Sequence, residues 1–371
     1  MTRVLVLNCG SSSLRYRLFD GSDVLTKGLI QRIGEAGGDA ADHREALQRL
    51  MDTVDLTGLA AVGHRVVHGG DRFTSSTVVT DDVVATIEEL VPLAPLHNPA
   101  ALTGLEVARK LLPEVPQVAV FDTAFHATIP PEGVRWAIDR EVAERWGIRR
   151  YGFHGTSHAY VSRETGRMLG KPVAETNVIT LHLGNGSSAT AVRGGRSVAT
   201  SMGMSPLSGL VMGTRSGDID PSVVFHLHRE AGLPIDEIEE LLTRRSGLQG
   251  LTGDNDMRTV LERRDQGDSE AALAFEIYCR RLREYVGAYL AVLGRVDAIT
   301  FTAGVGENSP VVREGALGGL EALGITVDPD RNGRNELIIS PDGSPITVCV
   351  VPTEEELEIA EEARRAIGSE S

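Results

Sequence analysis

Cysteine is scarce in this sequence of 371 residues, and its three copies, Cys9, Cys279 and Cys349, lie far apart. They form no C-x-x-C pair and leave one thiol over in any pairing, a pattern typical of a reducing compartment. Long apolar runs are missing too: none reaches the roughly 18 residues of a membrane-spanning helix, and the run near the N-terminus is too short for a signal peptide. We therefore expect a cytoplasmic protein without a membrane partner.

Positive charge is also in short supply. Lys and Arg number 37 against 52 Asp and Glu, a formal net charge of −15. Such a field repels polyanions, so nucleic acid and anionic membrane surfaces are poor candidate partners. Aromatic residues make up only 4% of the chain, but the hydrophobic content of 41% is that of an ordinary folded protein. Glycine, with 41 copies, exceeds its usual share of about 7%.

The informative glycines cluster where strands end. The apolar segment Arg3–Leu7 runs into Gly10–Ser13, and Val178–His182 runs into Gly184–Ser188. Each pattern is typical of a strand, a tight turn and a second strand. The two copies lie about one domain length apart, and a chain of this length predicts two or three domains at roughly 150 residues each. We infer a two-fold duplication of an α/β unit.

Helical patterns fill the intervals between the strands. Single strands are expected at Val118–Phe121 and Ala298–Phe301, and their alternation with helices predicts α/β layers with much parallel pairing. No Pro- or Ser-rich linker marks a boundary, so we expect domains packed around a cleft. The helices predicted from apolar periodicity are Asp81–Val91, Ala101–Leu111, Arg140–Trp146, Thr156–Leu169, Pro221–Glu230, Ile235–Arg244, Ser269–Leu293 and Glu354–Ile367.

The two glycine-rich turns offer consecutive backbone N–H groups and hydroxyls, which suit phosphate oxygens. A third cluster, Ala303–Asn308, follows the strand ending at Phe301 and strengthens this interpretation. Plain structural hairpins are the alternative. Neither a G-x-x-x-x-G-K-[ST] loop nor a G-x-G-x-x-G fingerprint is present, so P-loop and Rossmann sites are not indicated.

Most of the ten histidines fall between residues 64 and 182. The pairs His64/His68 and His154/His158 have the i,i+4 spacing that a helix could use to bind zinc. Neither pair has the H-E-x-x-H glutamate, and glycine interrupts or flanks both, so a zinc hydrolase is a distant alternative. For most of these histidines, bonding to buried backbone groups is the simpler interpretation.

His154 is the exception. The segment Tyr151–His158 predicts a loop that delivers one imidazole just before a helix capped by Thr156 or Ser157.

Two arginines stand out by their glycine neighbours. Arg65 lies within Gly63–Gly70, and Arg215 lies within Met212–Asp218. Surface arginines are normally inert, but flanking glycine lets a ligand approach the backbone, and a guanidinium can hold a carboxylate or phosphate bidentately. Two such groups suit a transfer between two anions, whose repulsion must be neutralised.

Together these segments resemble the acetokinase family over nearly the whole chain. The resemblance implies an α/β fold of two duplicated actin-like ATPase (ribonuclease H-like) domains flanking a central cleft. It implies an N-terminal acetate and magnesium domain of residues 1–126 plus 357–371, and a C-terminal nucleotide-binding domain of residues 127–356. The segments that carry it are Asn8–Leu14, Gly63–Gly70, Leu93–Pro99, Phe121–His126, Tyr151–His158, His182–Ser188, Met212–Arg215 and Thr302–Asn308.

The resemblance implies reversible phosphorylation of acetate by ATP, by direct in-line transfer, giving acetyl phosphate and ADP in a cytoplasmic homodimer. Mg²⁺, with Mn²⁺ as a substitute, is implied at Asn8 and Glu355, with Glu354 and Glu356 as alternative ligands. Propionate or butyrate is an alternative substrate, since one CH₂ in an apolar pocket is worth only about 1–3 kcal/mol. A non-catalytic ATP-binding switch, as in Hsp70 or actin, is the alternative from a different class.

Carried over residue by residue, the resemblance assigns catalytic roles to Asp122, His154 and Arg215 and binding of the acetate carboxylate to Arg65. Acetate is already ionised at neutral pH, because a carboxylic acid titrates near pH ~4. No general base is needed, so Asp122 is interpreted as orienting Arg65 or a magnesium-bound water. The other substrate contacts would be Val67, Leu96, His97, Phe153 and Pro206. The nucleotide contacts would be Arg15, His182, Leu183, Gly184, Asn185, Gly186, Asp256, Met257, Arg258, Gly304, Val305, Gly306, Glu307 and Asn308.

Four positions depart from the family pattern. Arg15 stands where Lys is common, Glu354 where Asn is common and Met257 where an aromatic residue is frequent, and Cys9 replaces the usual Ala.

Overall fold

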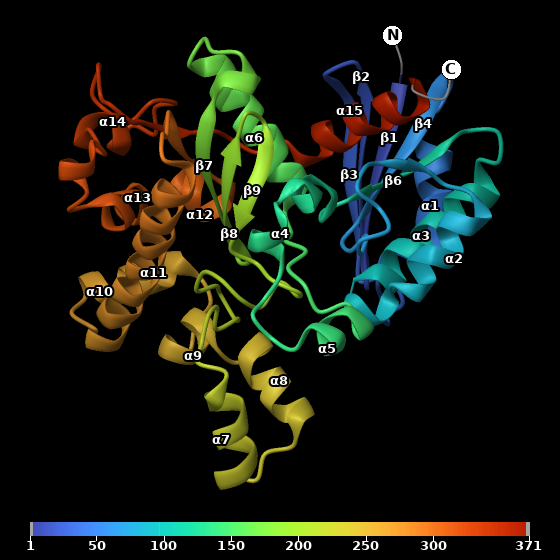
Figure 1. The fold of residues 1–371 in the computed structure, drawn as a ribbon. Helices are drawn as coiled ribbons and strands as arrows, with labels where there is room; N and C mark the ends of the chain where they lie inside the picture. Colours follow the sequence, from blue (N-terminus) through green and yellow to red (C-terminus); the bar gives the residue numbers. More distant parts are fainter. Residues whose placement is uncertain (1–2, 96, 369–371) are drawn as a thin grey trace. The chain divides into compact units, whose positions relative to one another are not determined.

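The computed structural model describes residues 3–95 and 97–368, which divide into two compact units (Figure 1). The short segment that carries His154 groups with unit 1, as does the start of the last helix, whereas the sequence placed both in the C-terminal domain. Unit 1 comprises Met1–Ala127, Phe153–Ser157 and Glu354–Ser371, and unit 2 comprises Thr128–Gly152 and His158–Thr353.

Unit 1 is built on a mixed sheet of six strands in the order β3-β2-β1-β4-β6-β5. The strands β1, β2 and β3 are antiparallel neighbours, and β4 and β6 run parallel to β1. The bounds are β1 Arg3–Gly10, β2 Ser13–Asp20, β3 Asp23–Gln31, β4 Leu59–Val66, β5 Thr77–Val78 and β6 Gln117–Phe121.

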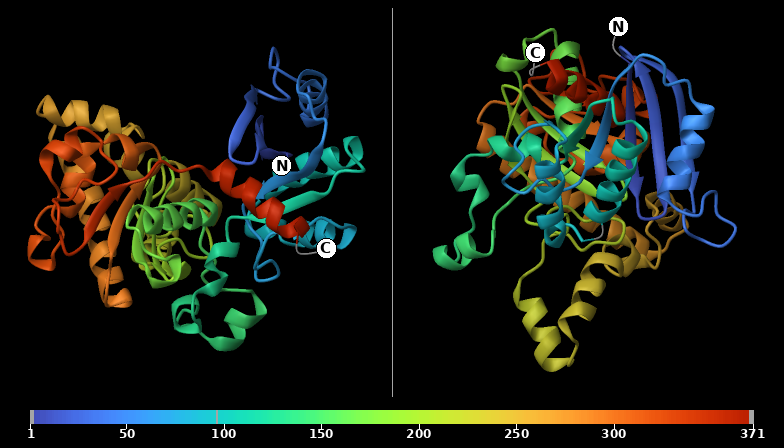
Figure 2. Two further views of the ribbon diagram at one scale, coloured as in Figure 1. Left: turned by 90° about the horizontal axis from the view of Figure 1, so that it is seen from above. Right: turned by 90° about the vertical axis from the view of Figure 1, so that its right-hand side faces the viewer.

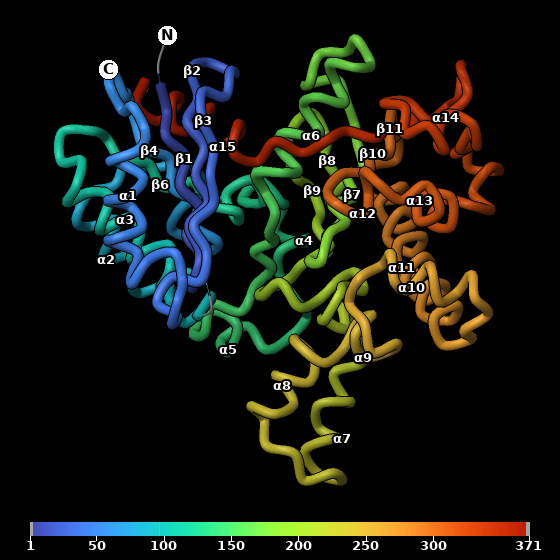
Figure 3. The backbone as a smooth tube through the Cα atoms, turned by 180° about the vertical axis from the view of Figure 1, so that it is seen from behind, coloured from blue at the N-terminus to red at the C-terminus, as the bar shows by residue number. Residues whose placement is uncertain are grey.

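Alternate residues of β1 feed two separate cores, as expected for a strand buried on both faces. Leu5 and Leu7 pack among residues of α1 and α3, whereas Val4 and Val6 pack against Ile359 of α15. The helices α1, α2 and α3 lie beside one another along the sheet (Figure 3). The bounds are α1 His43–Thr53, α2 Asp81–Glu89, α3 Asn98–Leu111 and α15 Glu355–Gly368, with 3₁₀ turns at Val91–Leu93 and Ala124–Thr128.

Unit 2 repeats this architecture. Its sheet has the order β11-β10-β7-β8-β9, with β7, β8 and β9 antiparallel and β10 and β11 parallel to β7. This order matches β6-β4-β1-β2-β3 of unit 1, so the duplication inferred from the two strand-turn segments is confirmed. The bounds are β7 Asn177–Leu183, β8 Ser187–Arg193, β9 Arg196–Thr200, β10 Ala298–Thr302 and β11 Thr347–Val350.

The long helix α11 (Ser269–Leu293) covers one face of this sheet and α6 (Gly155–Met168) packs on the other, where Thr165 bonds Thr300 at 2.9 Å. The helices α7 and α8 form a pair that extends away from the sheet of unit 2 (Figure 2). The remaining helices are α4 Pro131–Val134, α5 Arg140–Arg145, α7 Ser222–Glu230, α8 Ile235–Arg244, α9 Gly247–Thr252, α10 Met257–Asp265, α12 Ala303–Asn308, α13 Pro310–Leu317 and α14 Pro329–Gly333, with 3₁₀ turns at Val173–Glu175 and Glu321–Leu323.

The predicted bounds of α8 and α11 are confirmed. The helix α11 begins where Asp268 caps its first N–H groups and ends at Gly294, whose φ of 71° an L-residue rarely adopts. The predicted cap of α6 was wrong: this helix begins at Gly155, so Thr156 and Ser157 lie inside its first turn. Among the described residues, no helix combines the length and apolar character needed to cross a membrane.

Candidate active site

Arg65 and Asp122 form a buried ion pair in unit 1. Asp122 follows β6, and the parallel register of β4 and β6 brings it beside Arg65, with the Asp122 N–H donating to the Val66 carbonyl at 3.0 Å. Arg65 donates from Nε and from Nη2 to the Asp122 carboxylate, at 3.1 and 2.7 Å. The Asp122 side chain is 1% exposed and that of Arg65 is 22% exposed. The Asp122 charge raises the pKa of Arg65, so the guanidinium stays charged.

The third nitrogen of this guanidinium remains for a ligand. Nη1 of Arg65 makes no hydrogen bond with any residue in the described ranges. A partly exposed guanidinium that is fixed on one edge by a buried carboxylate can offer its other edge to an anion.

Asp122 also fixes the segment that carries His154. Its carbonyl accepts a hydrogen bond from the Gly155 N–H at 2.9 Å. A Cβ on Gly155 would lie 2.2 Å from that oxygen, so only glycine allows this approach. His154 itself has a φ of 56°, in the left-handed region that costs free energy for residues with a side chain. Asp122 therefore holds Arg65 through its side chain and the base of α6 through its backbone.

Phe153 is 2% exposed, and its ring meets that of His68 edge-on at 5.4 Å. The His126 ring bonds the Phe153 carbonyl at 2.9 Å. Val67 is half-buried between Val66 and His68, and His97 is exposed just before α3. Leu96, also predicted to bind substrate, lies outside the described residues. Of the predicted apolar contacts, Val67 and Phe153 thus belong to unit 1, whereas the remaining one, Pro206, belongs to unit 2.

Glu355 opens α15, and its carboxyl is influenced by the charges of Arg65, Asp122 and Glu356. Burial raises the pKa of Glu355; Arg65 opposes this rise, and the two neighbouring carboxylates add to it. A carboxylate crowded in this way favours a bound cation, and Mg²⁺ prefers oxygen ligands and needs only one or two from the protein. The residues present therefore fit a sparse magnesium site.

Two carboxylates beside Glu355 have partners in β2. Arg17 donates to Glu354 at 2.5 Å and lies 3.8 Å from Glu356, and Arg15 lies 3.9 Å from Glu356. In the β1–β2 register Arg15 pairs with Asn8, so Asn8 and the start of α15 share one end of unit 1. Arg15, predicted to bind nucleotide, forms this ion pair within unit 1.

In unit 2 the turn between β7 and β8 joins three of the predicted segments. The Asn185 carbonyl accepts from the Gly213 N–H at 3.0 Å, and its side chain accepts from Asn255 at 3.4 Å. A Cβ on Gly213 would lie 2.0 Å from Oδ1 of Asn185, which explains glycine at this position. Asn185 thus brings the Gly184–Gly186 turn, the loop of Arg215 and the start of α10 together.

Arg215 lies in this loop of unit 2. Its Nη1 donates to the Pro206 carbonyl at 3.1 Å and contacts the Met212 sulfur at 3.7 Å. Burial lowers the pKa of Arg215, and no carboxylate in the described part of the chain pairs with it. A partly buried guanidinium without an acidic partner suits an anionic ligand.

The third glycine cluster forms the short helix α12. Thr302 pairs with His182 in the parallel register of β10 and β7, so α12 begins beside the Gly184 turn. Gly304 and Asn308 are exposed, and a Cβ on Gly304 would meet nothing within 4 Å. The two glycine clusters therefore lie together at the carboxyl ends of adjacent strands, a usual position for ligands in α/β sheets.

The side chains of three predicted nucleotide contacts are buried: His182, which is 7% exposed, and two apolar residues. Leu183 is 0% exposed and Met257 is 4% exposed, and both pack in the core of unit 2. Their side chains are therefore core residues. Asp256 caps α10, and Arg258, with 88% of its side chain exposed, bonds Asp256 at 2.5 Å.

The zinc alternative requires a histidine pair on a helix, and His64 and His68 of unit 1 do not form one. His64 lies in β4 and bonds Gln117 at 2.8 Å, and the Gly70 N–H donates to Nδ1 of His68 at 3.0 Å. His158, in unit 2, bonds Thr180 and Ser188, both at 2.7 Å. Among residues 3–95 and 97–368, no three His, Cys, Asp or Glu side chains form a metal-binding group.

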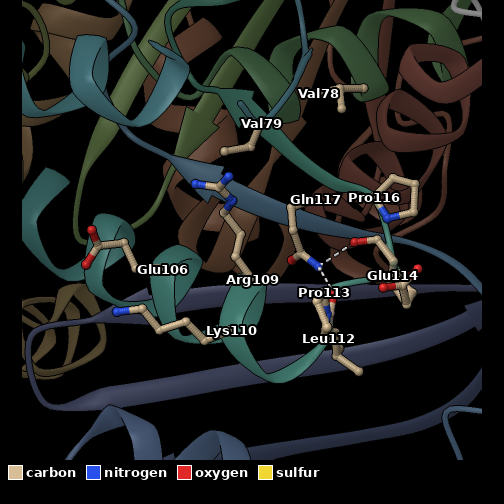
Figure 4. A pocket seen from close by; sticks show the side chains of 11 residues that line it. Val78, Val79, Glu106, Arg109, Lys110, Leu112, Pro113, Glu114, Pro116 and Gln117 are labelled. Carbon is tan, nitrogen blue, oxygen red and sulfur yellow. Dashed lines mark hydrogen bonds between the residues drawn. The ribbon is translucent and has the colours of Figure 1, made fainter. Parts of the chain in front are cut away.

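A hollow of about 570 Å³ lies in unit 1 beside β6 and the end of α3 (Figure 4). None of the predicted site residues lines it. Gln117, in its wall, bonds the Leu112 and Val115 carbonyls at 3.5 and 2.8 Å. Its lining is Val78, Val79, Glu106, Arg109, Lys110, Leu112, Pro113, Glu114, Val115, Pro116 and Gln117.

Two residues near the site were not singled out from the sequence. Asn98 is 0% exposed, accepts from the His68 N–H at 3.1 Å and donates to the His68 carbonyl at 3.0 Å. Thr123 accepts from the Gly69 N–H at 3.0 Å. Both stand inside segments that carried the family resemblance, so a closer analysis of those segments could have found them.

The comparisons with known proteins concern the chain as a whole. The family described as "Acetokinase family" matches residues 3–361. The chain is 57% identical to an acetate kinase of Streptomyces coelicolor, over 97% of this chain and 95% of that protein. It is 55% identical to an acetate kinase of Clavibacter michiganensis, over 99% of both.

Two solved structures also match this chain in backbone shape over nearly its whole length. The acetate kinase of Porphyromonas gingivalis has a TM-score of 0.94 at 40% identity, covering 99% of this chain and 100% of that one. A propionate kinase of Francisella tularensis has a TM-score of 0.93 at 40% identity, covering 98% and 100%. The duplicated fold, the family match and these identities show that the chain belongs to the acetokinase family.

Proposed function

We propose that this protein phosphorylates acetate with ATP, giving acetyl phosphate and ADP, and that the reaction is reversible. An acetate oxygen forms a bond to the γ-phosphorus while the bond from that phosphorus to the β–γ bridging oxygen breaks. The observation that carries the proposal is the Arg65–Asp122 pair, which leaves one edge of a charged guanidinium for a carboxylate. The names of the relatives support acetate as that carboxylate.

Arg65 binds the acetate carboxylate, and the further substrate residues that the family resemblance implies are Val67, Leu96, His97, Phe153 and Pro206. Asp122 is the orienting partner of Arg65. Both carboxylate oxygens of Asp122 accept from this guanidinium, at 3.1 and 2.7 Å. The nucleophile needs no base, because acetate is an anion at neutral pH.

His154 and Arg215 stabilise the phosphoryl group in transfer. Charge on its equatorial oxygens is best met by donors that are already fixed in place. The Gly155–Asp122 hydrogen bond and the Asn185–Gly213 hydrogen bond fix the two backbones that carry these side chains.

The nucleotide binds to residues of unit 2 that the sequence indicated: His182, the Gly184–Gly186 turn, the start of α10 and α12. Asn8 and Glu355 would hold Mg²⁺, with Mn²⁺ as a substitute. A bound magnesium ion supplies positive charge to the β- and γ-phosphates. We assign the metal and the acetate carboxylate to unit 1, which contains Asn8, Arg65 and Glu355, and the nucleotide to unit 2.

The family also supports a homodimer in the cytoplasm. The negative field of the whole chain repels ATP and acetate alike, so local cations at Arg65 and Arg215 must overcome it.

The test is acyl hydroxamate formation from MgATP, hydroxylamine and each short carboxylate. We expect most product with acetate and less with propionate and butyrate. Arg65→Ala should abolish product with every acid, while the exposed Arg280→Ala serves as a matched control with full activity. Absence of product from all acids in the wild type would overturn the proposal, and a maximum at propionate or butyrate would correct the substrate.

A further inference from the structure

The Glu307 carboxylate in α12 points back to the protein backbone. Its Oε1 accepts from the Ala303 N–H at 2.7 Å and from the Thr353 N–H at 3.1 Å, and the Thr302 hydroxyl lies 3.4 Å from it. All four residues belong to unit 2. One oxygen atom thus joins the start of the proposed nucleotide helix to a segment that lies some 50 residues further along the chain.

The hydrogen bond from the Ala303 N–H to Glu307 lies at a strained point of the backbone. Ala303 is not glycine, yet its φ is 65°, in the left-handed region. Such a conformation persists only where the surroundings fix it. The Glu307 side chain reaches back along its own helix to the strained N–H, much as a glutamate does in a capping box. The carboxylate therefore sets the shape of the turn from β10 into α12.

The contact at Thr353 reaches the end of unit 2. Thr353 is the last residue of unit 2 before the chain enters unit 1 at Glu354. Two residues earlier, the Val351 N–H donates to the Phe301 carbonyl at 3.0 Å. The departing chain is thus tied to β10 through Val351 and to Glu307 of α12 through Thr353, which lies two residues before Glu355.

The far end of α12 is held rigidly. Arg313 of α13 is 0% exposed and donates from Nη1 to the carbonyls of Gly306 and Glu307, at 2.9 and 3.0 Å. Its other nitrogens bond Asn332 and Asn335. Because this buried guanidinium holds the Glu307 backbone, the Glu307 carboxylate reaches Ala303 and Thr353 from a fixed position.

We propose that Glu307 is a positioning residue that couples nucleotide binding at α12 to the chain at Thr353, rather than a direct contact of the nucleotide. The proposal rests on the proposed function, because it takes Gly304–Asn308 as part of the nucleotide site. A nucleotide that fixes α12 also fixes the Thr353 N–H through Oε1 of Glu307.

Hydrogen–deuterium exchange of the full chain, with and without MgADP, tests this coupling in peptides covering residues 301–309 and 351–356. In the wild type, nucleotide should slow exchange several-fold in both peptides. Glu307→Ala should raise exchange of the 351–356 peptide in the free protein and remove its response to nucleotide. Glu307→Gln should behave as wild type, since an amide oxygen accepts the same two hydrogen bonds. Glu314→Ala, an exposed glutamate on α13, is the matched control.

Kinetics supply a second readout. The coupling predicts that Glu307→Ala raises the KM for ATP and lowers kcat with little change in the KM for acetate, while Glu307→Gln stays near wild type. Equal defects in both variants would show that the charge contacts the nucleotide directly, and would overturn the proposal.

The outcomes separate the two proposals. If nucleotide slows the 301–309 peptide but not the 351–356 peptide in the wild type, the coupling is wrong and the nucleotide site stands. If it slows neither, nucleotide does not bind at α12 and both are wrong. The wild-type comparison decides this even if Glu307→Ala fails to fold.

Discussion

Asp122 holds Arg65 by two nitrogens, at 3.1 and 2.7 Å, while its own side chain is 1% exposed. A buried carboxylate in that position is an orienting group for the guanidinium. The pair links two segments far apart in the sequence, and the parallel pairing of β4 with β6 explains how they meet.

Asp122→Asn should raise the KM for acetate at least tenfold, because a neutral amide holds the guanidinium less firmly. The free energy of unfolding should fall by about 1–3 kcal/mol, the usual loss for a hydrogen bond to a charged group. Initial-rate kinetics and urea unfolding measure both. A large fall in kcat with an unchanged KM for acetate would indicate instead that Asp122 acts in the chemical step.

Arg215→Ala should lower kcat by roughly 10³ or more, as with other arginines that stabilise a transferring phosphoryl group. The KM for acetate should change little, because acetate binds Arg65. The control is Arg280→Ala, an exposed arginine of unit 2 that pairs with Glu284 on α11. A loss smaller than tenfold would remove Arg215 from the catalytic residues.

His154→Ala should depress kcat by roughly 10²–10³ and change the KM for acetate less, because a donor to the transferring phosphoryl group acts mainly in the transition state. His154→Asn should recover part of kcat, since asparagine tolerates the φ of 56° and can donate a hydrogen bond. A pure effect on KM would assign His154 to ground-state binding.

Gly155→Ala should destabilise the protein by about 1–3 kcal/mol, since its Cβ would lie 2.2 Å from the Asp122 carbonyl and the backbone must shift. Activity should fall as well, because that shift displaces both Asp122 and His154. The matched control is Gly287→Ala in the middle of α11, where a Cβ meets nothing within 4 Å. That variant should gain roughly 0.5–1 kcal/mol. Thermal and urea unfolding measure the stability of both variants. Equal effects of Gly155→Ala and Gly287→Ala on the free energy of unfolding would contradict the crowding at Gly155.

His64 gives unit 1 a pH-dependent stability. Burial lowers its pKa from 6.5 to about 4, although a hydrogen bond to Gln117 opposes the shift. The unfolded chain then binds more protons than the folded chain between these values, so stability is full above pH 6.5 and falls as the pH drops toward 4. The loss should reach roughly 3 kcal/mol. Urea unfolding of wild type and His64→Gln at pH 7.5 and 4.5 measures it, and equal pH dependence in the two would contradict it.

The duplicated α/β fold was predictable because its signals are local. The apolar runs at Val4 and Val178 and their glycine turns mark the same strand position in both units. The periodic helices α8 and α11 were equally clear. The first residue of α6 could not be predicted in this way, because it depends on a hydrogen bond to the distant Asp122 carbonyl.

The candidate residues were found through motifs, but their partners depend on tertiary contacts. Nothing in the spacing of Arg65 and Asp122, or of Glu307 and Thr353, shows that they bond. The burial of Met257, a predicted nucleotide contact, could not be predicted for the same reason, since burial is set by packing against distant helices.

The central claim is that an acetate oxygen attacks phosphorus directly. Acetate labelled with ¹⁸O in its carboxyl group, incubated with MgATP and this protein, tests it by ³¹P NMR of the product. The account predicts acetyl phosphate whose phosphorus resonance carries the isotope shift of a bonded ¹⁸O, and predicts no such signal with Arg65→Ala. Wild-type protein that forms no acetyl phosphate, or forms it without ¹⁸O on phosphorus, would contradict the account.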